Sequence, residues 1–71
     1  MNATKLLKEL ADFNSTRGEI FFVENENHDI NIWFSRKSSK WILELNGKII
    51  MASKFAISLV NKLQDINLLK K

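Results

Sequence analysis

"KWILELNGKIIM", residues 40–51, decides the fold of this chain, because these residues have the pattern of a complete β-hairpin. Asn46-Gly47 is the strongest short-range hairpin signal, since a type I′ turn needs positive φ at both of its central residues. Before the turn, residues 41–45 alternate between the two sides of a strand. After it, residues 48–51 return as a short strand. The segment therefore predicts two antiparallel strands joined by a two-residue turn.

A two-residue turn also predicts which residues oppose each other, and opposed residues lie on the same side of a sheet. The predicted pairs are Leu45–Lys48, Glu44–Ile49, Leu43–Ile50, Ile42–Met51 and Trp41–Ala52. In this register Trp41, Leu43, Leu45 and Ile50 share one face of the sheet, whereas Ile42, Glu44, Ile49 and Met51 share the other.

Two further strands precede the hairpin. Residues 29–35 alternate strictly, with Ile30, Ile32 and Phe34 on one side and Asn31, Trp33 and Ser35 on the other. Residues 19–24 are rich in β-branched and aromatic side chains, which favour strands. The polar segments between the strands are typical of turns. We therefore expect an antiparallel meander of four strands, or of three strands and a short fourth.

Amphipathic helices are predicted on both sides of the meander. Residues 3–13 place apolar side chains at steps of three and four, with Asn2 or Thr4 as N-cap and a stop at Asn14, followed by a break at 15–18. Residues 54–68 repeat the pattern, with Ser53 as the expected N-cap. The expected fold is α+β, a helix–meander–helix arrangement over residues 1–71 as one domain, with both helices on one face of the sheet.

This arrangement leaves the second face of the sheet uncovered. The side chains expected there are Trp33, Ile42, Ile49 and Met51, together with two of residues 20–23. Solvated sheet faces normally carry polar residues, and a large exposed apolar patch indicates an interface. These four residues are therefore the candidate partner-binding set. The alternative is one helix on each face, which would place Trp33 in a second small core.

Positive charge collects at the other candidate site. The chain has 71 residues and a net charge of +3. The predicted topology brings five basic side chains to the end of the sheet where the second helix begins: Arg17, Arg36, Lys37, Lys40 and Lys54. Cations beside a helix N-terminus favour anions, and Trp33 could stack on an unpaired base. Nucleic acid is thus the alternative partner, although solvated turn residues would produce the same pattern.

Several other classes of function are disfavoured by composition. The chain has no Cys and one His, and it lacks a glycine-rich phosphate loop, so we expect no enzyme and no cofactor. Glu24, Glu26 and His28 alternate in one turn but lack the features of a calcium loop, so we expect no metal. Charges within the first residues and the short apolar runs predict neither a signal peptide nor a membrane span, and the expected location is the cytoplasm.

Two topological analogies exist, and neither assigns a family. The helix–strands–helix order resembles that of double-stranded-RNA-binding domains, but "ASKFAIS" at residues 52–58 offers only Lys54 where those domains carry a lysine cluster. "KWILELNGKII" at residues 40–50, followed by a helix, is similar to the three-stranded DNA-reading domains of some phage integrases.

The leading expectation is a small non-enzymatic binding protein that contacts a protein target or a second copy of itself. Size and composition suit an accessory or inhibitor protein of a mobile element or phage. The nucleic-acid-binding module is the second reading. A structural subunit of an assembly is the third, and its stability would depend on protein concentration.

Overall fold

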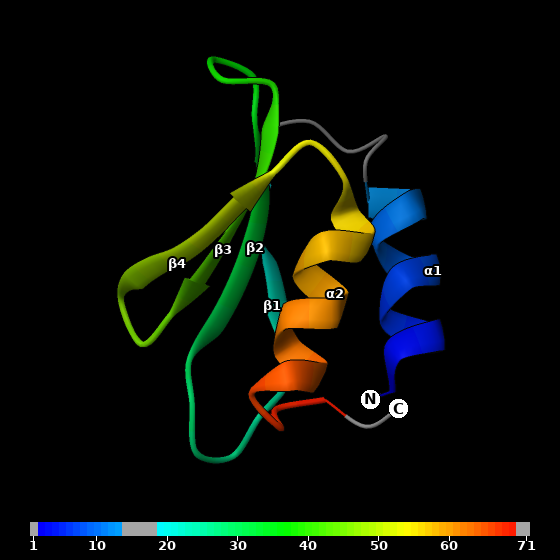
Figure 1. The fold of residues 1–71 in the computed structure, drawn as a ribbon, viewed down its shortest axis with the longest axis vertical. Coiled ribbons are helices and arrows are strands. Elements are labelled where there is room, and N and C mark those ends of the chain that lie inside the picture. Colours follow the sequence, from blue (N-terminus) through cyan, green and yellow to red (C-terminus); the bar gives the residue numbers. More distant parts are fainter. Residues whose placement is uncertain (1, 14–18, 70–71) are drawn as a thin grey trace.

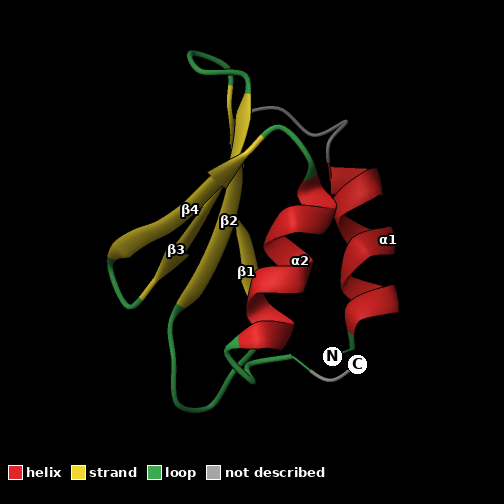
Figure 2. Cartoon of the chain, in the orientation of Figure 1, coloured by secondary structure: helices red, strands yellow, loops and turns green. Residues whose placement is uncertain are grey.

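The computed structural model of the chain describes residues 2–13 and 19–69. Its elements follow the order α1 (Ala3–Phe13), β1 (Phe21–Val23), β2 (Ile30–Ser35), β3 (Lys40–Leu45), β4 (Lys48–Ser53) and α2 (Ala56–Asp65). The strands form one antiparallel sheet in the order β1-β2-β3-β4. Both helices lie side by side on the same face of this sheet (Figures 1 and 2). The predicted α+β meander with a one-sided helical layer is therefore confirmed.

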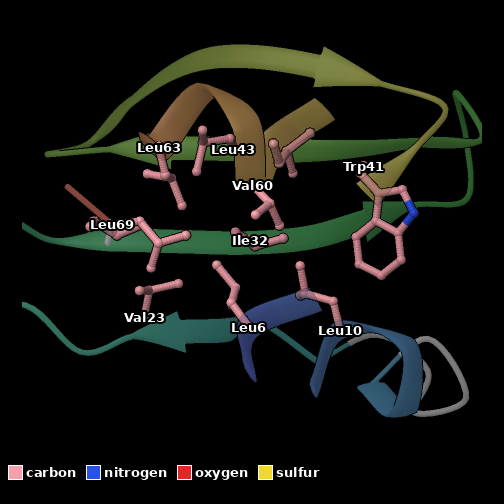
Figure 3. Packing of buried hydrophobic residues seen from close by; sticks show 11 residues of the cluster. Leu6, Leu10, Val23, Ile32, Trp41, Leu43, Val60, Leu63 and Leu69 are labelled. Carbon is pink, nitrogen blue, oxygen red and sulfur yellow. The ribbon is translucent and has the colours of Figure 1, made fainter. Parts of the chain in front are cut away.

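A layer of apolar side chains between the helices and the sheet forms the core. Its buried members are Leu6, Leu10, Val23, Ile30, Ile32, Trp41, Leu43, Leu59, Val60, Leu63 and Leu69. Figure 3 shows side chains from both helices meeting those of the strands in this layer. On β2 and β3 the buried residues are every second one, as expected for strands with one covered face.

Helix α1 begins at the cap that the sequence favours. The Lys5 backbone N–H donates to Asn2 Oδ1 at 2.8 Å, and the Leu6 N–H donates to the Asn2 carbonyl at 3.0 Å, so Asn2 is the N-cap. At the other end, the Phe13 ring packs edge-on against Phe21 of β1, with centroids 5.6 Å apart. The predicted stop at Asn14 and the break at 15–18 lie outside the described residues.

Helix α2 begins later than predicted, because β4 continues two residues further than expected. Ser53 does not cap the helix: it is the last residue of β4, and its Oγ accepts a hydrogen bond from the Phe55 N–H at 3.2 Å. The N-cap is Phe55, which has extended backbone angles and provides no side-chain hydrogen bond. The expected helix over 54–68 is thus shortened to Ala56–Asp65.

The C-terminus of α2 is closed by a Schellman motif around Asn67. Asn67 has a φ of 61°, and its N–H donates to the Gln64 carbonyl at 3.1 Å. The Leu68 N–H reaches back to the Leu63 carbonyl at 2.9 Å. The motif turns the chain so that Leu69, which lies beyond the helix predicted over residues 54–68, enters the core with 7% of its surface exposed.

The hairpin between β3 and β4 differs from the predicted register. Asn46 and Gly47 have φ values of 50° and 84°, as a type I′ turn requires, and Glu44 still opposes Ile49. Beyond that pair Ile50 is an extra residue, a β-bulge, and Leu43 opposes Met51 instead of Ile50. Every later pair shifts by one, so that Ile42 opposes Ala52 and Trp41 opposes Ser53. Met51 therefore lies on the covered face and packs against the core.

The bulge predicts losses of stability of different size for two neighbouring truncations. Met51→Ala is expected to lower the free energy of unfolding by about 1–2 kcal/mol, because it removes a side chain that packs on the core. Ile50→Ala is expected to lower it by less than about 0.5 kcal/mol, because Ile50 is exposed. Urea unfolding of both variants measures the difference. A larger loss for Ile50→Ala would support the unbulged register.

Candidate functional site

The uncovered side of the sheet is the candidate site, and we call it the open face. It comprises the outward side chains of the four strands: Phe22, Asn31, Trp33, Ser35, Lys40, Ile42, Glu44, Ile49 and Ala52. None of these residues is buried, whereas their strand neighbours on β2 and β3 mostly are. No described helix crosses this side of the sheet (Figure 2). The alternative in which Trp33 enters a second core is therefore wrong.

Strand pairing arranges the open face in rows that run across the sheet. The central row is Trp33, Ile42 and Ala52, which oppose one another across β2, β3 and β4. Trp33 and Ile42 are half-buried and Ala52 is exposed. Cross-strand neighbours of this kind pack on each other along a sheet surface. The row thus forms a continuous apolar band across the middle of the open face.

The neighbouring row combines a polar pair with exposed apolar flanks. Asn31 Nδ2 donates a hydrogen bond of 2.8 Å to Glu44 Oε1. Phe22 on β1 and Ile49 on β4 lie on either side of this pair, with 72% and 61% of their surfaces exposed. Large apolar side chains that are this exposed are typical of a surface that is covered by a partner.

The predicted partner-binding residues divide between the two faces. Trp33, Ile42 and Ile49 lie on the open face, but Met51 lies on the covered one because of the bulge. Phe22 was not singled out from residues 20–23, since that apolar run has no alternation. Its pairing with Asn31 is what assigns it to the open face.

The structure describes four of the five basic residues that the sequence predicts at one end of the sheet. Arg36 and Lys37 lie in the β2–β3 turn, and Lys40 begins β3. Lys54 directly follows β4. Because Ser53 pairs with Trp41, the neighbouring Lys54 lies close to Lys40. All four side chains are exposed. Arg17 lies outside the described residues.

Hydrogen bonds join the acidic turn between β1 and β2 to the β3–β4 hairpin. The backbone N–H of Asp29 donates to Asn46 Oδ1 at 2.9 Å, and the Asn46 N–H donates to the Asp29 carbonyl at 2.8 Å. Asn46 Nδ2 also lies 3.2 Å from His28 Nδ1. These contacts fasten the turn to the β3–β4 hairpin. Within residues 2–13 and 19–69, no cluster of three His, Asp or Glu side chains could hold a metal ion.

Comparison with known proteins provides no relative. The chain matches no protein-family model, no curated protein and no solved structure. Among the described residues, no helix has the length and apolar character needed to cross a membrane.

Proposed function

We propose that this protein is a small binding protein that contacts another protein chain through the open face. The observation that carries the proposal is the uncovered apolar band of Trp33, Ile42 and Ala52, extended by the exposed Phe22 and Ile49. When one face of a sheet is in water, the residues that point to that face are normally polar. Here the outward set is mainly apolar, which fits a surface that spends part of its time covered.

The composition of the open face supports a protein partner in particular. Aromatic side chains dominate the binding energy of protein interfaces, and they act best at the centre of a patch, where neighbours exclude water. Trp33 occupies such a position, next to Ile42 in the central row. The Asn31–Glu44 hydrogen bond adds a fixed polar group that can set the orientation of a partner.

A photo-crosslinking amino acid introduced at one position on each side of the molecule tests the proposal. Position 49 lies on the open face with 61% of Ile49 exposed, and position 61 lies on the solvent side of α2, where Asn61 is exposed. We expect protein crosslinks from position 49 and few from position 61. Mass spectrometry of each product measures whether the captured chain is a second copy or a different protein.

The control position makes the outcome decisive. Equal crosslinking from positions 49 and 61 would indicate unspecific encounters and overturn the proposal. Crosslinks from position 61 alone would place the contact on the helical layer. A prior measurement of the unfolding midpoint of both labelled proteins ensures that each is folded.

A further inference from the structure

We propose that the open face binds a second copy of this chain, face to face, about a two-fold axis that runs along the Trp33–Ile42–Ala52 row. The inference rests on the proposed function and names its partner. Three observations carry it: the pattern of charge on β3, the short or bulged strands at the two edges of the sheet, and the central position of the apolar row.

The outward residues of β3 are arranged symmetrically about Ile42, with opposite charges. Lys40 lies two residues before Ile42 and Glu44 two residues after it, so each charge stands about 7 Å from the central row. Lys40 and Glu44 of one chain are therefore about 14 Å apart along the strand, too far to pair with each other. Lys40 forms no ion pair within the described part of the chain.

A two-fold rotation about the central row brings these charges together between copies. The rotation keeps each strand over its own counterpart and reverses its direction. Lys40 then faces Glu44 of the second copy, and Glu44 faces Lys40 of the second copy. The two apolar rows meet in the middle. Such an interface is self-complementary, as a symmetric dimer requires.

A second face-to-face arrangement is disfavoured by the same charges. A two-fold axis that runs along β3 would place Lys40 over Lys40 and Glu44 over Glu44 of the second copy. Like charges at an interface cost free energy and exclude that arrangement. The charge pattern thus favours the axis along the central row over an axis along β3.

The edges of the sheet offer no equally good site for a second copy. Edge β1 is only three residues long, and edge β4 is interrupted by the bulge at Ile50. Short and bulged edge strands resist pairing with another chain. Association of two copies is therefore directed to the open face.

The hydrogen bond between Asn31 and Glu44 can persist in this dimer, but the small area of the open face limits the strength of association. Glu44 uses Oε1 for the hydrogen bond from Asn31, so its second oxygen can accept from Lys40 of the second copy. Three strands of six residues and one of three cover only roughly 340 Å² in projection, which is at the small end for stable interfaces. We therefore expect a dimer that dissociates on dilution.

Charge reversal combined with sedimentation of the purified full chain tests the inference. Wild-type protein is expected to shift from monomer to dimer between micromolar and millimolar concentration. Lys40→Glu should weaken the dimer by about tenfold or more, because it places two carboxylates together at each contact. The double variant Lys40→Glu/Glu44→Lys should restore wild-type association, since it only exchanges the partners.

Lys37→Glu is the matched control, because it changes the net charge equally from the turn outside the open face. It should leave association within about twofold of wild type. Circular dichroism checks the fold of each variant. If Glu44→Lys disrupts the fold by removing the bond to Asn31, the comparison of Lys40→Glu with Lys37→Glu still decides the matter.

Each contrary result identifies what has failed. Wild-type protein that stays monomeric at millimolar concentration overturns the inference. A dimer that responds equally to Lys40→Glu and Lys37→Glu overturns it too, as does a folded double variant that fails to associate. A monomeric chain whose position 49 crosslinks a protein of different mass overturns self-association while supporting the proposed function.

Discussion

Trp41→Ala is expected to lower the free energy of unfolding by about 3–5 kcal/mol. Trp41 is only 5% exposed, belongs to the core, and packs edge-on against Phe34 with ring centroids 5.5 Å apart. A chain of 71 residues has a total stability of about 4–11 kcal/mol, so this substitution should remove from about a quarter of the stability to all of it. Urea unfolding followed by far-ultraviolet circular dichroism measures the loss.

Trp33→Ala is the matched control, because it removes the same side chain from the opposite face of the sheet. Trp33 is half-buried and lies on the open face, which no described helix covers (Figure 2). The expected loss is about 1 kcal/mol or less at monomer concentrations, which reflects strand preference and cross-strand packing. Comparable losses for the two variants would contradict a one-sided core.

Leu63→Ala is expected to lower the free energy of unfolding by about 2–5 kcal/mol. Leu63 is fully buried and lies in the layer between α2 and the sheet, as Figure 3 shows. Its truncation leaves a cavity that the surrounding strands and helices can fill only in part. It also removes the apolar partner that the Schellman motif normally uses at this position. The same urea titration measures the effect.

Ile57→Ala provides the comparison within the same helix. Ile57 has half of its surface exposed, so its truncation should cost less than about 1 kcal/mol, partly offset by the better helix propensity of alanine. A cost for Ile57→Ala as large as that for Leu63→Ala would mean that α2 is rotated relative to the sheet.

The candidate site was predictable where the sequence alternates. Residues 29–35 and 41–45 alternate between two sides except that Trp33 and Ile42 are apolar on the outward side, and the pairing of the two strands then places Trp33 and Ile42 together. The run of residues 49–52 is apolar throughout, so no alternation shows which residue of Ile50 and Met51 faces the helices. The regular register was the natural expectation after Asn46-Gly47, and it was wrong for Met51.

By itself, the sequence determined the order of elements, the antiparallel meander and the turn at Asn46-Gly47, because these follow from local periodicity and from the φ values that the turn requires. Only the tertiary structure decided the bulge at Ile50, the late start of α2 and the burial of Leu69. The physical reason is that all three depend on which apolar side chains fit between the helices and the sheet. An apolar run or a chain end carries no local signal for that choice.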